Sequence, residues 1–202
     1  MMARTSIRPA RTGLATLLLL LPFASCVTPT SDGGGEPVPA SFQLLSERQP
    51  ADVAVAPLFD KTGRRDAPLD ALRGELAATL VERLYSPLSV AYVDANWVDS
   101  SFRGTPPPDA LLSVTLTRWD PSRLYSTGFV RVGADLVLFE GADSTGRVLW
   151  RESLSRDVDL RSGNGRPPGP DAGHLDRAIE LFAREALAGL PERDPVAAHP
   201  VP

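Results

Sequence analysis

The chain contains a single cysteine, Cys26, so no disulfide within the chain can hold its fold together. A chain without disulfides depends on buried apolar surface. About 150 residues remain for one domain once both ends are excluded, which is enough for a real core. Because an unpaired thiol invites wrong pairing in an oxidising compartment, a lone cysteine in an exported protein points to a specific role.

Residues 1–25 have the order of a secretory signal. Residues 1–12 contain three arginines and no acidic residue, Leu14–Leu21 form a short apolar run, and two small residues precede Cys26. The apolar run is too short to cross a bilayer as a mature helix. We therefore interpret residues 1–25 as a signal peptide.

The stretch Leu21–Cys26 resembles a bacterial lipobox, with Phe23 where the pattern usually has leucine. The resemblance implies that Cys26 is lipidated and becomes the first mature residue. Each buried methylene contributes about 0.8 kcal/mol, so two or more acyl chains hold a protein on a membrane. Val27 stands where an aspartate would indicate inner-membrane retention, so we expect the periplasmic face of the outer membrane. The alternative is an ordinary signal peptide with a chance cysteine near its cleavage site.

The mature chain is acidic. The formal net charge of −4 becomes −7 when residues 1–25 and their three arginines are removed. An acidic surface disfavours nucleic acid and anionic lipid headgroups as partners. We therefore expect no nucleic acid partner and a membrane contact only through the N-terminal lipid.

Segments poor in apolar residues bracket one domain. Residues 27–40 offer almost no apolar surface, so residues 26–45 are predicted as the lipidated cysteine and a flexible tether. Residues 46–190 are predicted as a single α/β domain. Residues 191–202 are predicted as a disordered tail.

Hydrophobic periodicity predicts the first elements. The apolar run 52–57 indicates a buried strand that ends at a proline. Residues 68–85 carry leucines at three- and four-residue steps, which predicts an amphipathic helix with Asp66 and Pro68 at its start. Residues 88–93 are predicted as a second strand. The leucines of the helix are Leu69, Leu72, Leu76, Leu80 and Leu84.

The second half of the chain predicts a β meander and a helix. Residues 110–117 alternate apolar and hydroxyl side chains, and the same alternation puts Trp119 on the hydroxyl face. Residues 130–140 and 147–154 form a hairpin around a turn, and an apolar stripe over 175–190 indicates a helix. The predicted fold class is α/β: a two-layer sandwich with a mixed β-sheet, built as β-α-β, an antiparallel meander and a C-terminal helix, with the helices packed on the sheet.

Several segments resemble known envelope domains. Val53–Phe59 with the following helix looks like the opening of the TolB N-terminal and curli-secretion-pore type α/β domains. Asp109–Trp119, the strand to Glu140, and Thr145–Trp150 are similar to a family of small outer-membrane lipoproteins of unassigned function. The resemblance covers roughly residues 50–190. It implies an accessory role in envelope assembly or transport and supplies no catalytic residues.

Catalytic chemistry leaves little trace in the mature chain. Its two histidines are His174, expected as a solvated residue in the first turn of a helix, and His199 in the tail. No nucleophile elbow or phosphate-binding loop is present, and Gly163-Asn-Gly165 reads as a plain connector because no helix follows it at once. We therefore expect no enzyme, no cofactor and no metal site.

The three tryptophans are candidates for a contact surface. The alternative is that Trp97, Trp119 and Trp150 cover the edges of the core. Trp97 and Phe102 precede the proline-rich stretch Thr105–Pro108 and have no evident place in a periodic element. We interpret them as a partner-facing loop.

Two functions remain open at this point. The first is a non-enzymatic lipoprotein that docks to another envelope protein, such as a component of a secretion or transport complex. The second is a periplasmic binding or regulatory lipoprotein for cell-wall synthesis or a small ligand. A pocket with convergent polar groups would favour the second, and an apolar patch the first.

Overall fold

A computed structural model describes residues 40–161, 165–167, 169 and 173–194. All of these belong to the unit formed by residues 37–202. The predicted signal peptide, Cys26 and His199 lie outside the described residues. No helix within the described ranges is long and apolar enough to span a bilayer.

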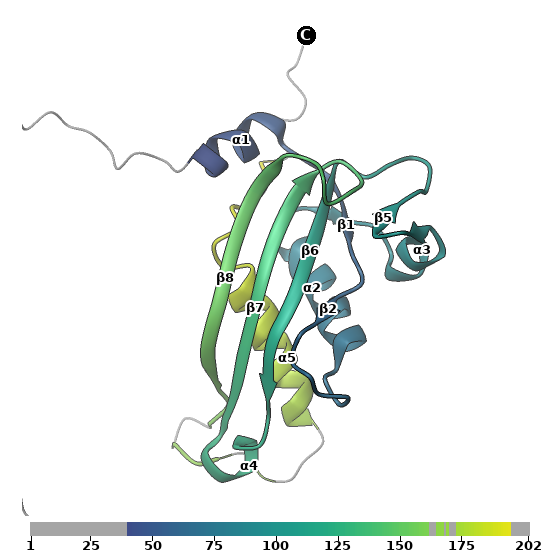
Figure 1. The fold of residues 1–202 in the computed structure, drawn as a ribbon. Helices are drawn as coiled ribbons and strands as arrows, with labels where there is room; N and C mark the ends of the chain where they lie inside the picture. The colour runs from purple at the N-terminus through teal and green to yellow at the C-terminus, as the bar shows by residue number, and fades with distance from the viewer. Residues whose placement is uncertain (1–39, 162–164, 168, 170–172, 195–202) are drawn as a thin grey trace, which may run out of the picture. The chain divides into compact units, whose positions relative to one another are not determined.

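The described chain is a mixed α/β fold (Figure 1). Six strands form one mixed sheet in the order β3-β1-β6-β7-β8, with β2 also beside β6, and β4 and β5 form a separate small hairpin. The elements are α1 (Ala40–Arg48), β1 (Asp52–Val55), β2 (Phe59–Asp60), α2 (Leu69–Glu82), β3 (Ser86–Pro87), α3 (Val90–Ala95), β4 (Trp97–Val98), β5 (Ser101–Phe102), β6 (Ala110–Asp120), α4 (Leu124–Thr127), β7 (Phe129–Glu140), β8 (Val148–Asp159) and α5 (Gly173–Ala186).

Helices α2 and α5 lie against one face of the sheet (Figure 1). The predicted leucine stripe is confirmed in the middle of α2, where Leu72, Leu76 and Leu80 are fully buried. It fails at the end, because the helix stops at Glu82 and Leu84 is 50% exposed with a φ of +66°. The next residue, Tyr85, enters the core instead and is 5% exposed.

The predicted strand over residues 88–93 is wrong. Only Ser86 and Pro87 pair with β1, and the chain then turns into helix α3. Ser89 is the N-cap of α3, and its hydroxyl oxygen accepts a hydrogen bond from the backbone N–H of Tyr92 at 3.3 Å. A serine that satisfies a free N–H in the first turn favours a helix start over a strand.

Strand β6 contains a bulge that the sequence pattern did not predict. Leu116 pairs with Ala134 and Arg118 pairs with Gly133, so Thr117 is an extra residue without a partner. The extra residue shifts the alternation by one, which turns Trp119 to the core side. Trp119 is therefore 1% exposed and not, as predicted, on the hydroxyl face.

The meander β6-β7-β8 confirms the predicted hairpin, and β8 continues to Asp159. Both ends of the domain are more ordered than predicted. Helix α1 begins at Ala40, inside the predicted tether, and its Leu45 is buried in the main core. At the other end, Arg193 donates its backbone N–H to the carbonyl oxygen of Arg83, so the first residues of the predicted tail are attached to the domain.

Candidate functional site

The sheet face away from α2 and α5 carries the candidate site. Leu112 and Val114 of β6 point into the main core, whereas Ser113 and Thr115 alternate with them and are half-buried on the other face. The predicted hydroxyl face is thus confirmed for these two residues. Leu111 shares that face but is fully buried.

Leu111 is buried because a second, smaller core covers this face of the sheet around it. Its buried members come from β1 and the chain just after it, α3, β5 and β6, and they are Ala54, Ala56, Val93, Phe102 and Leu111. Side chains packed against it include Tyr92, Trp97 and Phe139. The second core therefore fixes α3 and the β4–β5 hairpin on the sheet.

The β4–β5 hairpin holds Trp97 in place. Trp97 pairs with Phe102, and the two loop residues Asp99 and Ser100 have φ values of +48° and +62°. Two positive φ values in a two-residue loop are typical of a type I′ turn, which usually contains glycine or asparagine. The backbone N–H of Phe102 donates to the carbonyl oxygen of Ala142 at 3.0 Å, so the hairpin is also attached to the β7–β8 turn.

Phe102 does not face outward as predicted. Its side chain is 3% exposed and meets the ring of Tyr92 edge-on, with 5.6 Å between ring centroids. A Cβ added at Gly104 would lie 2.3 Å from the Phe102 ring, so the backbone passes directly over it. Phe102 is a core residue that supports the hairpin.

Trp97 is half-buried and lines a groove of about 390 Å³. Four hydroxyl side chains face the groove together with apolar ones, and no lining residue is charged. The residues that line the groove are Ala56, Pro57, Leu58, Phe59, Trp97, Ser100, Leu111, Ser113, Thr115 and Ser144. They come from the chain at β2, the β4–β5 hairpin, β6 and the β7–β8 turn.

Phe59 is the most exposed aromatic residue of this groove, with 60% of its surface accessible. It lies on β2, directly beside Thr115 of β6. The Lys61 ammonium lies 5.7 Å from the centre of its ring, a cation–π distance. Phe59 was not predicted from the sequence as a site residue. Pro57 was the available signal, because a proline two residues after β1 prevents the buried strand from continuing to Phe59.

The other two tryptophans belong to the main core. Trp119 meets Phe182 of α5 edge-on at a centroid distance of 6.4 Å. Trp150 is 1% exposed, and its indole N–H donates to the carbonyl oxygen of Gly189 at 3.1 Å. A buried indole with a satisfied N–H is a structural residue.

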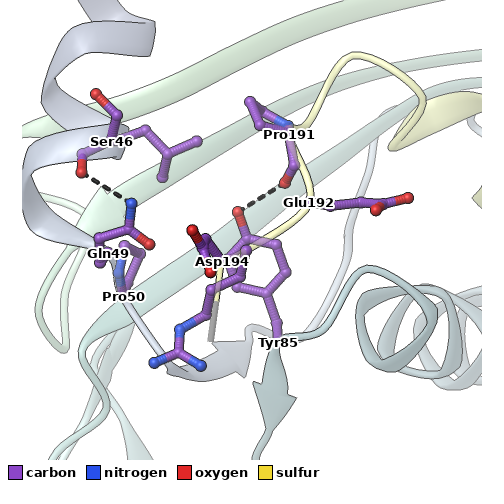
Figure 2. Close-up of a pocket in the computed structure, with 9 residues that line it drawn as sticks. Ser46, Gln49, Pro50, Tyr85, Pro191, Glu192 and Asp194 are labelled. Carbon is purple, nitrogen blue, oxygen red and sulfur yellow. Dashed lines mark hydrogen bonds between the residues drawn. The ribbon is translucent and has the colours of Figure 1, made fainter. Parts of the chain in front are cut away.

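A second hollow, near Tyr85, is small (Figure 2). Its volume is about 90 Å³, the room of roughly three waters and well below the 300 Å³ of a small ligand pocket. The hydroxyl group of Tyr85 donates to the carbonyl oxygen of Pro191 at 3.0 Å, and Gln49 donates to the carbonyl oxygen of Ser46 at 2.9 Å. Burial raises the pKa of Tyr85 to about 12. The hollow is best explained as the seam where the C-terminal segment attaches.

His174 does not line the groove. His174 is the second residue of α5 and is half-buried. Within the described ranges, no three or more histidine, cysteine, aspartate or glutamate side chains gather where they could hold a metal ion. The groove itself therefore offers hydroxyl groups and aromatic surface as its chemistry.

The chain matches no family model and no curated protein. It is similar to several solved structures. The PelC dodecamer from Paraburkholderia phytofirmans is 20% identical over 71% of this chain and 90% of that chain, with a TM-score of 0.45. Lipoprotein GNA1162 from Neisseria meningitidis is 17% identical over 70% and 99%, with a TM-score of 0.42. A minor lipoprotein from Acinetobacter baumannii is 12% identical over 70% and 96%, with a TM-score of 0.32. These values are too low to support a statement about the function or assembly of this chain.

Proposed function

We propose that this protein is a lipoprotein anchored through Cys26 to the periplasmic face of the outer membrane, where it acts as a non-enzymatic accessory or assembly factor for an envelope secretion or transport complex. On this proposal it belongs with the small outer-membrane lipoproteins of TolB-like fold. Its fold is a two-layer sandwich in which α2 and α5 form the second layer. The signal-like residues 1–25 and the lipobox-like Leu21–Cys26 support the location.

One observation carries the binding role: Phe59 is 60% exposed at the edge of the groove that Trp97 lines. Aromatic side chains are enriched among the residues that dominate protein–protein binding, and this one stands beside further apolar surface and not alone. The ring is held on a sheet strand, so little conformational entropy is lost when a partner covers it.

The lining of the groove favours binding over turnover. A serine or threonine hydroxyl becomes a nucleophile only with a general base within hydrogen-bond reach. None of the ten lining residues is a histidine, a carboxylate or a lysine. Apolar surface flanked by hydroxyl groups instead suits a partner that buries an apolar side chain and donates or accepts a few hydrogen bonds.

A small ligand is the second candidate, and it has one observation in its favour. The groove volume of about 390 Å³ lies within the usual range for ligand pockets, and the hydroxyls of Ser100, Ser113, Thr115 and Ser144 line it together. Such an arrangement suits an uncharged, hydroxyl-rich ligand such as a cell-wall fragment.

The test replaces Phe59 with a photo-cross-linking amino acid in the tagged full chain, expressed in its native host. We expect one dominant covalent adduct with an envelope protein. Phe59→Ala should abolish co-purification of that protein while leaving the melting temperature unchanged, because the ring is mostly solvated. Tyr125→Ala is the matched control, since Tyr125 is 55% exposed on α4, away from the groove.

Trp97→Ala is a second variant with a different expectation. Because Trp97 also packs on the second core, this substitution should lower the melting temperature as well as weaken binding.

If the envelope protein still co-purifies in full with the Phe59→Ala variant, the docking role is contradicted. A cell-wall fragment that raises the melting temperature of the wild type but not of Phe59→Ala, with no protein adduct, would favour the small-ligand role instead.

A further inference from the structure

Strand β8 is an edge strand of the sheet, and helix α1 lies against part of it. Among the strands of the described residues it is the last in the order, and it pairs only with β7 (Figure 1). The bulge opposite Phe139 lies at Leu149, so the ten residues from Trp150 to Asp159 run without interruption. They contain no proline. A long regular edge without proline is a template for pairing with another strand.

The direction of the backbone groups on β8 follows from one hydrogen bond. The backbone N–H of Leu160 donates to the carbonyl oxygen of Gly128 at 2.8 Å, so the backbone N–H and C=O groups of Leu160 point toward β7. In an antiparallel pair, alternate residues point toward the partner strand and the residues between them point away. The N–H and C=O groups of the odd-numbered residues of β8 therefore face outward. These residues are Arg151, Ser153, Ser155, Asp157 and Asp159, and all five are exposed.

The charges along this edge are complementary to themselves. When a second copy of the strand is placed antiparallel and centred on Leu154, Arg151 lies opposite Asp157 and Glu152 lies opposite Arg156. By symmetry each pair occurs twice. Opposite charges directly across two strands are stabilising, and like charges are destabilising.

The backbone limits the possible registers, and the charges select one of them. Only the odd-numbered residues direct their backbone N–H and C=O groups outward, so odd residues of one copy must pair with odd residues of the other. The two-fold axis must therefore lie between one residue and the same residue of the second copy. Centring on Ser153 would place Glu152 opposite Leu154, and centring on Ser155 would place it opposite Val158. Of these three centres, only Leu154 places an opposite charge across from each of Arg151, Glu152, Arg156 and Asp157.

Two of these charged side chains have no partner within the described chain. No ion pair or side-chain hydrogen bond to another described residue joins Arg151 or Glu152. Arg156 uses one guanidinium nitrogen on Glu185, at 2.5 Å, and Asp157 uses one carboxylate oxygen on Arg131, at 3.1 Å. Arg156 and Asp157 therefore each have a further atom with which to meet Glu152 and Arg151 of a second copy.

We propose that the chain forms a symmetric dimer in which β8 pairs antiparallel with β8 of a second copy, centred on Leu154. The two sheets become one continuous sheet. The interface is independent of the proposed partner groove, because that groove lies beside β2 and β6 and the dimer uses the opposite edge of the sheet. Dimerisation therefore leaves Phe59 accessible.

The test measures the mass of the full chain, purified in a mild detergent, by sedimentation equilibrium over a range of concentrations, with the same detergent ratio for every variant. The wild type should reach twice the monomer mass. Arg151→Glu places like charges opposite each other twice and should weaken the dimer about tenfold or more. The double variant Arg151→Glu with Asp157→Arg restores opposite charges and should recover the dimer. Arg123→Glu is the control, because Arg123 is an exposed arginine at the start of α4, off this edge.

Hydrogen exchange shows whether the dimer uses this edge. The backbone N–H groups of Ser153 and Ser155 should exchange slowly in the wild type and the double variant and fast in Arg151→Glu. A wild type that stays monomeric at all concentrations overturns the proposal. So does an oligomer that Arg151→Glu leaves intact, or one in which the Ser153 and Ser155 amides exchange fast.

Discussion

Arg73 of α2 forms an ion pair with Asp94 of α3, with 2.5 Å between Nη1 and Oδ1. The Arg73 side chain is only 4% exposed, whereas that of Asp94 is 53% exposed. Arg73 also donates two hydrogen bonds, at 3.0 and 2.8 Å, to the carbonyl oxygen of Val55 at the end of β1. One buried guanidinium therefore joins α2, β1 and α3, and α3 leads directly into Trp97 at the groove.

Arg73→Ala should destabilise the domain by about 3–5 kcal/mol, because it leaves a buried carbonyl group without a donor and Asp94 without its partner. Asp94→Ala should also be costly, since it leaves the buried arginine charge uncompensated. Urea denaturation followed by circular dichroism measures both. Arg64→Ala is the control, because Arg64 pairs with Asp66 at the exposed surface, and it should leave the denaturation midpoint unchanged. Equal midpoints for Arg73→Ala and Arg64→Ala would contradict the prediction.

The sequence predicted the long elements because they repeat a pattern over many residues. The alternation over Val130–Leu138 and the spacing of Leu72, Leu76 and Leu80 each offer several independent positions that agree. It failed where one residue decides the outcome. Ser89 converts an apolar run into a helix, and Thr117 shifts a strand by one residue, and neither belongs to a repeating pattern.

The candidate site was predicted only in part for the same reason. Trp97 was found by its lack of a periodic position, and it does line the groove. Phe102 shares that lack of periodicity, yet it is buried, because the hairpin that contains it folds onto a second core formed by residues distant in sequence. The role of Phe59 depends on where β2 meets β6, which no local pattern states.

The bulge at Thr117 makes an unusual prediction: deletion of this residue should be tolerated. Without Thr117, Leu116, Arg118 and Trp119 keep their partners on β7 and alternate regularly, so Trp119 stays in the core. We expect a loss of less than about 1 kcal/mol in the free energy of unfolding and a native tryptophan emission spectrum. Urea denaturation followed by fluorescence measures both.

Deletion of Thr115 is the matched control. It also shortens β6 by one residue, but it moves Leu116 to the solvent face and Thr117 into the core. Loss of a buried leucine costs about 2–5 kcal/mol, so this deletion should be far more destabilising. Similar losses for the two deletions would contradict the assignment of Thr117 as the extra residue.

Lipidation of Cys26 is tested by Cys26→Ser. The protein should still be exported but lose stable membrane association, because residues 1–25 carry the export signal and the acyl chains carry the anchor. Detergent-phase partitioning and incorporation of labelled palmitate measure the two effects separately. A Cys26→Ser protein that stays in the membrane fraction, or a wild type that takes up no label, would contradict lipidation.

The buried Tyr85 makes the domain sensitive to alkali. Burial raises the pKa of Tyr85 from 10.0 to about 12, so between these two pH values the unfolded chain releases the phenol proton while the folded chain retains it. The unfolded state then binds fewer protons, and the free energy of unfolding must fall as the pH rises. The stabilising contribution is complete below pH 10 and is lost as the pH approaches 12.

Urea midpoints measured across this interval should fall steadily for the wild type. Tyr85→Phe removes the titrating group along with its hydrogen bond to Pro191, so it should start from a lower midpoint and show a shallower decline. Parallel curves for the two proteins would show that Tyr85 ionises equally in the folded and unfolded chains.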